Sequence, residues 1–294
     1  MRLKEIIVGL ALVAISSVCL AQEEEAQINP NSLLTIPKYE QLYKIKVWRV
    51  IDLREKQNKG FFARGNEMPD LILKAIKSGE IADIYWTDSL DRKMSKEDFN
   101  KAITTKEAET PPAWEPAKDF YKGDRVSFNG VNYEATDDSK GKNPSTSKNE
   151  WQGPVGKAET LKGSDIYILK LVEDVIFDKR RSRQYFDVLG IGLYAFDQDQ
   201  GLLKPRGWIK YKDLEKVFRN HVKEAIWFNR YNTAENRNYA DAFLLRLFHG
   251  TIEKVENPDD DTIFNLYKSH TEGVYATDWE EMKMMEREHN LWEY

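Results

Sequence analysis

The sequence predicts an α+β fold, with a main domain of mixed strands and helices that is interrupted by a small all-β three-stranded module. Three observations lead to this class. β-rich and helix-like runs follow one another without the regular alternation of a parallel α/β sheet. A segment in mid-chain alternates polar and apolar residues around an Asn-Gly turn. Stretches rich in Pro, Thr and Gly enclose that segment and set it apart.

Length and composition agree with this organisation. The chain has 294 residues, of which 41% are hydrophobic, 32% charged and 12% aromatic, so it is long enough for one large domain and a small one. The formal net charge is -5. Proteins that bind nucleic acid usually carry a basic excess, and we therefore expect no nucleic-acid partner.

The N-terminus has the pattern of a secretory signal. Two basic residues precede an apolar run over residues 6–15, and small residues follow up to Ala21. We expect a signal peptide over residues 1–21 and a flexible, acidic leader over residues 22–35; an uncleaved N-terminal helix is the alternative. Cys19 is the only cysteine of the sequence, so the mature chain is expected to have no disulfide and no cysteine-ligated metal.

Before the inserted segment, the main domain is predicted to contain two strands and a helix. Residues 44–53 place Ile and Val at the spacing of a strand. Residues 69–78 place Leu and Ile on one face of a helix, and Gly79 is suited to end it. Residues 81–86 predict a second, short strand.

After the inserted segment, residues 166–177 and 187–196 are β-rich and predict two strands of a hairpin or meander, joined by the charged residues 178–183. Helices are predicted over residues 211–224 and 239–249, the second ending before a glycine.

Two shorter patterns complete the main domain. Thr277 and Glu280 have the spacing of a capping box and predict the start of a third helix. Gly190 and Gly192 lack the third glycine of a nucleotide-binding loop, so they predict a strand with a close approach or a bend.

The inserted segment is the most patterned part of the chain. Residues 120–135 read FYKGDRVSFNGVNYEA, in which two alternating runs flank an Asn-Gly turn, and this predicts a β-hairpin. We expect an inserted β domain over residues 111–156, and a main domain formed by residues 36–110 and 157–294.

The sequence shows no catalytic motif of the serine-hydrolase, phosphate-loop or zinc-protease kind, and its histidines are scattered. We therefore expect no catalytic residue, no metal site and no cofactor. The densest basic spot is formed by Arg180, Arg181 and Arg183. It is either a contact at the rim of an interface or an anion site, or an exposed turn with paired arginines.

The inserted segment is similar to the small carbohydrate-binding modules of chitinases. The matching positions are Ala113, Trp114, Tyr121, Gly123, Asp124, Val126, Gly130, Tyr133, Ala135, Gly141, Pro144 and Trp151. The resemblance implies exposed aromatic rings that stack on sugars, so Trp114, Tyr121, Tyr133 and Trp151 are the candidate glycan-facing residues. The same four rings could instead form the core of so small a unit. Residues 136–139, TDDS, stand where chitin-binding members often carry a tryptophan pair.

The rest of the chain carries a second resemblance on three segments. These are VWRVIDLRE at 47–55 with Asn58 after it, EDVIFDKRRS at 173–182 with LGI at 189–191, and FNRYNTAE at 228–235 with Phe243, Arg246 and Phe248 downstream; EHNLWEY at 288–294 also fits. On these segments the chain resembles the GldN/PorN family, a periplasmic ring component of the type IX secretion and gliding-motility machinery of Bacteroidota. Asp187 departs from this pattern, because the family usually has a basic residue there.

The second resemblance implies a non-enzymatic structural subunit of a ring in the periplasm. Its partner would be a ring-forming outer-membrane lipoprotein, named GldK or PorK, together with other type IX secretion components. Interfaces are enriched in aromatic residues and arginine. The candidate partner contacts are Trp48, Arg49, Arg181, Phe228, Arg230 and Trp292. Core packing or internal ion pairs are the other roles for the same residues.

Two other functions stay open at this point. The first is a secreted glycan-binding protein that uses the inserted module on chitin-like or peptidoglycan sugars. The second is a hydrolase with an accessory module.

Overall fold

A computed structural model describes residues 28–106, 111–156, 159–197, 200–267 and 269–291. The expected signal peptide and the first part of the expected leader lie outside these residues. The chain divides into two compact units, one formed by residues up to 95 and from 163 onward, the other by residues 96–162. The predicted α+β class is confirmed.

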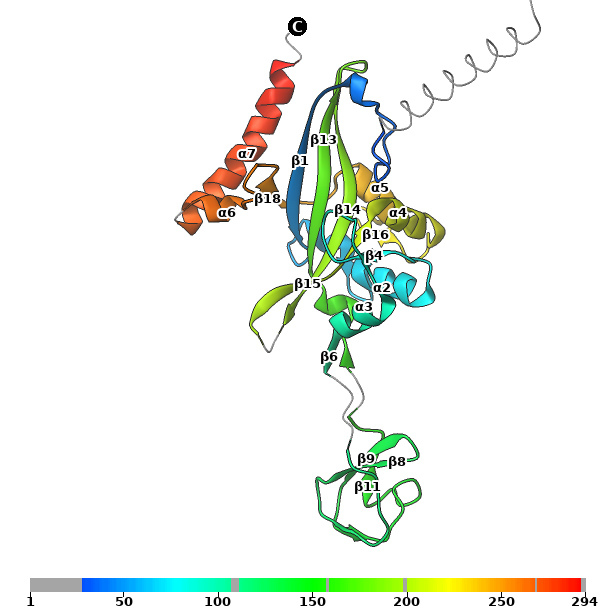
Figure 1. Ribbon diagram of the computed structural model, residues 1–294. Helices are drawn as coiled ribbons and strands as arrows, with labels where there is room; N and C mark the ends of the chain where they lie inside the picture. The colour runs from blue at the N-terminus through cyan, green and yellow to red at the C-terminus, as the bar shows by residue number, and fades with distance from the viewer. Residues whose placement is uncertain (1–27, 107–110, 157–158, 198–199, 268, 292–294) are drawn as a thin grey trace, which may run out of the picture. The chain divides into compact units, whose positions relative to one another are not determined.

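The first unit is built on an antiparallel sheet of seven strands in the order β18-β1-β13-β14-β15-β4-β5 (Figure 1). The strands are β1 (Gln41–Asp52), β4 (Ile84–Tyr85), β5 (Lys93–Met94), β13 (Ile168–Asp178), β14 (Arg183–Asp197), β15 (Leu202–Lys210) and β18 (Thr251–Val255). Two short hairpins accompany them: β2 (Phe62–Ala63) with β3 (Asn66–Glu67), and β16 (Ile226–Trp227) with β17 (Arg237–Asn238).

A long hairpin of β13 and β14 forms the middle of the sheet, as the two β-rich runs predict. Its turn is closed by Asp178, whose carboxylate accepts hydrogen bonds from the backbone N–H groups of Arg180 (2.8 Å) and Arg181 (3.2 Å). Ser182 completes the turn with a φ of 48°. The charged segment therefore forms the turn that ends β13 and begins β14, two strands that are otherwise largely buried on both faces.

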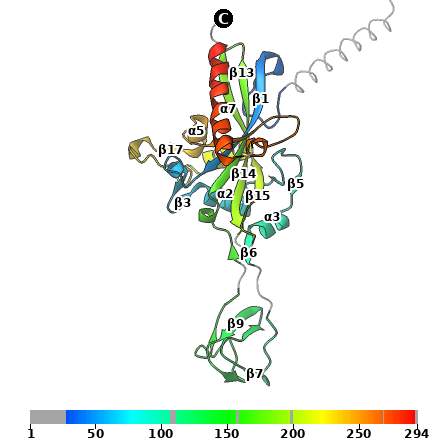
Figure 2. The same cartoon turned by 90° about the vertical axis from the view of Figure 1, so that its left-hand side faces the viewer.

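The helices of the first unit lie on both sides of the long strands. They are α2 (Met68–Ser78), α4 (Tyr211–Asn220), α5 (Tyr239–Leu244), α6 (Ile263–Leu266) and α7 (His270–Asn290). In Figure 1, α6 and α7 lie on one side of the strands and α2, α4 and α5 on the other. Figure 2 shows α7 as the outermost element on its side, running along the strands.

Three helix predictions have different outcomes. α2 matches its predicted range and ends at Gly79, which has the left-handed φ of 84°. The predicted helix over 239–249 is too long: α5 stops at Leu244, because Arg246 takes a left-handed φ of 52°. The predicted capping box is wrong, since α7 begins seven residues before Thr277, at His270.

A cluster of aromatic rings joins the helices to the segment after β1. Phe61 stacks on Tyr239 with ring centroids 5.7 Å apart, and it contacts Phe243 at 5.1 Å. Phe218 of α4 packs against the same tyrosine at 5.5 Å. All four rings are buried, so burial of aromatic area fixes α4 and α5 to the chain that follows β1.

The second unit contains the predicted hairpin. β8 (Arg125–Phe128) and β9 (Val131–Ala135) pair through a turn whose two residues, Asn129 and Gly130, have φ values of 50° and 75°. Two positive φ values are what a two-residue hairpin turn requires. β11 (Trp151–Gln152) completes a three-stranded sheet in the order β11-β9-β8.

The remaining elements of the second unit are short. They are α3 (Lys96–Ile103), β6 (Thr104–Lys106), β7 (Asp119–Phe120), β10 (Ser139–Lys140) and β12 (Glu159–Thr160). β7 pairs with β10, and β6 pairs with β12. The small core consists of Phe120, Val126, Ala135 and Trp151, with Trp114 and Tyr133 packed against it.

The predicted close approach in β14 is confirmed at Gly192, where the ring of Trp208 lies against the backbone. A Cβ at this position would be 2.7 Å from the ring atom Cε2 of Trp208. We expect Gly192→Ala to lower the free energy of unfolding by about 1–3 kcal/mol, because the tryptophan has to move out of a packed core. Urea unfolding of the purified chain measures the change.

The matched control for this variant is Gly190→Ala, two residues earlier on the same strand. Its Cβ would meet the methyl groups of Leu90 at 3.0 and 3.2 Å, which can rotate away, and the backbone oxygen of Ile209 at 3.3 Å, which needs a shift of only a few tenths of an ångström. We expect a smaller loss than at Gly192. Equal losses would show that the tryptophan contact is not the cause.

Candidate functional site

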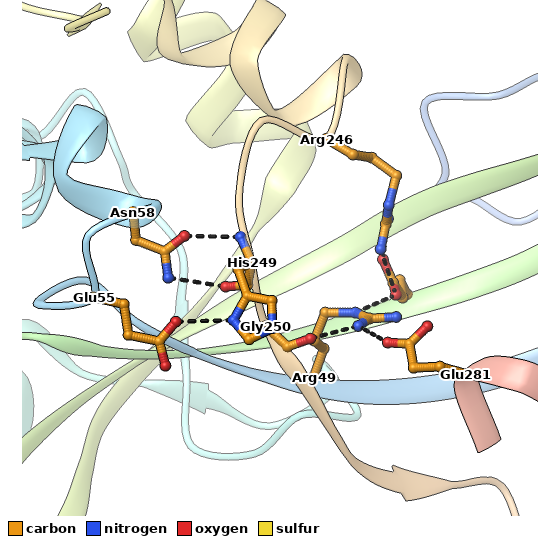
Figure 3. A network of polar contacts seen from close by, with 8 residues as sticks. Arg49, Glu55, Asn58, Arg246, His249, Gly250 and Glu281 are labelled. Carbon is orange, nitrogen blue, oxygen red and sulfur yellow. Dashed lines mark hydrogen bonds and ion pairs between the residues drawn. The ribbon is translucent and has the colours of Figure 1, made fainter. Parts of the chain in front are cut away.

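A buried ion-pair network lies where β1, β13 and the loop before β18 meet (Figure 3). Glu173 of β13 has no solvent exposure. Its carboxylate accepts from Arg49 Nε (3.1 Å) and from Arg246, through Nη1 (2.7 Å) and Nη2 (3.3 Å). Arg49 also pairs with Glu281 of α7. These four residues are called the arginine–glutamate network below.

Gly250 brings the backbone into this network. Its carbonyl oxygen accepts a hydrogen bond from Arg49 Nη1 at 2.6 Å. A Cβ at Gly250 would lie 2.8 Å from both the backbone oxygen of Val50 and a side-chain atom of Ile51. Glycine is needed here because β1 passes too closely for any side chain.

A second set of contacts holds the same loop to the chain after β1. Asn58 donates from its amide nitrogen to the carbonyl oxygen of His249 (2.9 Å) and accepts from the N–H of His249 (2.8 Å). The His249 ring lies 2.8 Å from the carboxylate of Glu55 (Figure 3). The loop is therefore fixed on both sides, by Asn58 and by Arg49.

The charges of the network stabilise one another. Burial alone would raise the pKa of Glu173, but Arg246 and Arg49 outweigh it and hold that pKa below its usual value. Burial would lower the pKa of Arg49, and Glu173 and Glu281 reverse this and raise it. Both groups stay ionised at neutral pH, which suits a structural network and not a general acid or base.

A pocket of about 370 Å³ opens beside the network. Its lining includes Arg246, Phe186 and Phe248 on one side and Asp278 and Glu281 of α7 on the other. The guanidinium of Arg246 stacks on Phe186, 4.0 Å from the ring centroid. Arg49 also lines it, so the pocket combines aromatic walls with both basic and acidic groups.

The structure places Trp48 and Arg49 on opposite faces of the sheet. Arg49 is 4% exposed and is occupied by the internal ion pairs, the role that sequence reasoning gave as its alternative. Trp48 is partly buried: its Nε1 donates to Asp88 (2.5 Å), and Lys254 lies 3.8 Å from its ring centroid. Both side chains therefore make contacts within the chain.

Arg181 lies at the hairpin turn, far along β13 from the network. Its guanidinium pairs with Asp178 at 2.6 Å, and Arg180 pairs with Glu40 at 3.3 Å. These contacts agree with the interpretation as a turn with paired arginines. Trp292 lies outside the described residues.

Phe228 and Arg230 belong to an exposed loop between β16 and β17. Asn229 Oδ1 accepts from the N–H groups of Tyr231 (3.0 Å) and Asn232 (3.2 Å). Both predicted residues are exposed, and Tyr231 is 93% exposed. Sequence reasoning missed Tyr231, although its place inside the FNRYNTAE segment was a usable signal. The asparagine hydrogen bonds present three adjacent large side chains in an ordered loop.

The aromatic candidates of the inserted module differ in exposure. Trp151 is 3% exposed and donates from Nε1 to the carbonyl oxygen of Lys142 at 3.1 Å, so it serves the core. Trp114 packs edge-on against Phe128, with centroids 5.3 Å apart. Tyr133 is partly buried, and Tyr121 is 65% exposed. Only Tyr121, among these four described residues, offers most of its ring to solvent.

A pair of buried acidic residues lies on β13 and β14, apart from the arginine–glutamate network. Asp174 and Asp187 are directly opposite each other, and both are buried. Lys44 pairs with Asp174 at 2.6 Å, and Asn29 donates to the same carboxylate at 3.3 Å. The N–H of Leu33 donates to Asp187 at 3.4 Å. Part of the expected leader therefore contacts the sheet at this pair.

The described part of the chain contains no group of three or more His, Cys, Asp and Glu side chains that could hold a metal ion. Within the same residues, no helix is long and apolar enough to span a bilayer.

We predict that Glu173→Gln is strongly destabilising. The change leaves the buried Arg49 and the partly buried Arg246 without their shared counter-charge, and breaking a buried pair in this way costs about 3–5 kcal/mol. Guanidinium unfolding measures the loss. Glu235→Gln is the control, because it breaks an exposed pair with Arg237 (3.1 Å) and should cost less than about 1 kcal/mol. A loss at Glu173 no larger than the control would contradict the structural role.

Asp187 predicts a specific dependence of stability on pH. Burial raises its pKa from 3.8 to about 6. The folded state therefore binds the proton more tightly than the unfolded state, so this contribution is complete below about pH 4 and is lost as pH rises through 6. Between pH 5 and pH 8 the wild type should lose about 1 kcal/mol through this group.

Asp187→Asn should remove that contribution, so urea unfolding should show the variant gaining about 1 kcal/mol relative to the wild type between pH 5 and pH 8. The exposed Asp259→Asn variant is the control and should show no such change. An Asp187→Asn profile parallel to that of the wild type would refute the assignment.

Two comparisons with known proteins bear on the identity of the chain. A family model described as "Gliding motility associated protein GldN" matches residues 36–293. A search of curated proteins gave no match. The network residues Arg49, Glu173 and Arg246 come from the three segments that carry the sequence resemblance, and all three lie within the matched range. Because the match covers most of the sequence, this chain belongs to the GldN family of gliding motility associated proteins.

Proposed function

We propose that the chain is a non-enzymatic structural subunit of the type IX secretion and gliding machinery. It assembles in the periplasm with a ring-forming outer-membrane lipoprotein of the GldK/PorK kind, and through that partner it is held at the outer membrane. The observation that carries the proposal is the convergence of the three family segments on Glu173. The residues of these segments that meet at Glu173 form ion pairs that fix the arrangement of the strands and the loop, as expected of a structural subunit.

The loop with Phe228, Arg230 and Tyr231 supports a role in protein binding. Interface hot spots are enriched in tyrosine and arginine, and an ordered loop loses little entropy on binding. The loop is exposed, and its backbone is held by Asn229 and Asn236, whose side chain accepts from the N–H of Asn229 at 2.9 Å. We assign this loop to contact with the lipoprotein.

The test is co-purification of the mature chain with the lipoprotein from the same organism. We expect a complex, and we expect Phe228→Ala with Arg230→Ala to weaken it at least tenfold, since two hot-spot side chains are lost. The control is Trp86→Ala with Arg92→Ala, an exposed aromatic–arginine pair with the guanidinium 5.9 Å from the ring centroid. No complex for the wild type, together with normal secretion and gliding after gene deletion, would refute the proposal.

Glycan binding by the second unit is the other candidate function, and the exposure of Tyr121 favours it. The same preparation, with and without residues 112–155, is applied to insoluble chitin and peptidoglycan. Retention that disappears with these residues and with Tyr121→Ala supports this function. Loss of the lipoprotein complex on removing the same residues would instead make the module part of the assembly.

A further inference from the structure

α7 has a second apolar face that none of the described residues covers. Tyr275, Trp279 and Met282 are 69%, 52% and 54% exposed. At about 100° per residue these three side chains fall within about 60° of one another around the helix axis. Thr277 and Met284, which are buried against the sheet, fall on the opposite side. The helix is thus apolar toward the protein and again toward solvent.

Five other large apolar side chains are exposed between residues 264 and 285, namely Phe264, Leu266, Tyr267, Val274 and Met285. Phe264 packs against Gly273, where a Cβ would lie 2.5 Å from its ring, and Gly273 falls on the side of α7 opposite Tyr275. We therefore call Tyr275, Trp279 and Met282 the α7 outer surface. Large apolar side chains gathered on one exposed face mark an interaction site.

The inner side of α7 holds that surface in place. Ala276 and Met284 pack in one core cluster with Val47, Val175 and Ile252 of the sheet. Glu281 joins the arginine–glutamate network through Arg49. Near the C-terminal end, Gln184 donates to Glu288 at 3.4 Å. A helix held along its length presents its outer side chains without a large ordering cost on binding.

The charges on α7 indicate the chemistry of the partner. Glu272, Asp278 and Glu286 lie on or beside the outer surface and make no ion pair with any described residue, whereas Lys283 is paired with Glu280 at 2.7 Å. Two copies of this acidic surface would repel each other, and anionic lipid would be repelled as well. A partner with lysine or arginine beside its apolar residues is complementary.

The neighbouring pocket does not indicate the charge of the partner, because Arg49 and Arg246 line it together with Asp278 and Glu281. Arg246 already stacks on both aromatic walls, 4.0 Å from the ring centroid of Phe186 and 5.1 Å from that of Phe248.

We infer that the α7 outer surface is the docking site for an amphipathic helix of a partner protein, with basic residues beside its apolar face. A helix fits because the side chains recur at i, i+4 and i+7 along a straight ridge, and such a ridge packs into the groove of another helix. This inference rests on the proposed function and adds the surface and chemistry through which a ring partner is held.

The experiment measures the affinity of the purified lipoprotein, without its lipid, for the mature chain. Trp279→Ala with Met282→Ala should weaken binding at least tenfold. Leu202→Ala with Leu203→Ala, an exposed apolar pair on β15, is the control and should leave affinity unchanged. Asp278→Lys should weaken binding more than Asp259→Lys, which makes the same change in net charge, and should reduce its salt dependence. Thermal unfolding checks that each variant folds.

The outcomes separate this inference from the proposed function. If the wild type binds and the α7 variants bind equally well, the docking site is wrong and the structural role stands. If the wild type does not bind the lipoprotein at all, the inference falls, and the proposed function falls with it when secretion and gliding are normal after gene deletion. Two further results overturn the inference: sedimentation showing a dimer that the α7 variants lose, or co-sedimentation with anionic phospholipid vesicles that they lose.

Discussion

The negative charge of Glu173 is the constraint on which much of this molecule depends. A carboxylate with no solvent exposure is costly by several kcal/mol unless opposite charges and hydrogen bonds surround it. Arg49 and Arg246 provide them, and they come from positions about 120 residues before and about 70 residues after Glu173 in the sequence. The strands and the loop can therefore reach low free energy only in the arrangement that brings both arginines to one carboxylate.

That requirement explains local features that would otherwise be unfavourable. Arg246 holds a left-handed backbone conformation, which costs a non-glycine residue of order 1 kcal/mol or more, and this ends α5. The same conformation directs its guanidinium to Glu173 and onto the ring of Phe186. Gly250 has no side chain, which lets its backbone lie close enough to β1 for its carbonyl oxygen to accept from Arg49. At both positions the contacts of the buried charge offset an unfavourable local choice of backbone conformation or residue.

The sequence predicted those parts of the fold that depend on neighbours along the chain. α2, with Gly79 at its end, and the turn of Asn129 and Gly130 follow from local backbone chemistry, and both were predicted within a residue or two. The end of α5 was missed because the reason lies at Glu173, far away in the sequence. The start of α7 was missed because Thr277 makes its hydrogen bond to the carbonyl of Gly273 inside the helix, at 2.9 Å, instead of capping it.

In the candidate site, too, residue type could be read from the sequence, whereas the contacts between distant residues could not. Arg49 was singled out by residue type, since arginine and tryptophan are common at interfaces, but residue type does not distinguish a surface arginine from one that neutralises a buried acid. Its partner Glu173 lay inside a matched segment, and only the pairing of β1 with β13 reveals the contact. Asp187 was singled out in the sequence as a departure from the pattern of the resemblance, and the structure places it opposite Asp174.

The acidic residues of α7 fall into two sets with different surroundings. Glu281 and Glu288 face the sheet and find partners in Arg49 and Gln184. Glu272, Asp278 and Glu286 face outward, among aromatic and methionine side chains, and have no ion pair within the described chain. Solubility alone would favour acids without exposed Trp and Met beside them. Both kinds of residue on one rigid face fit a helix whose inner side is bound by its own sheet and whose outer side is bound by a basic partner.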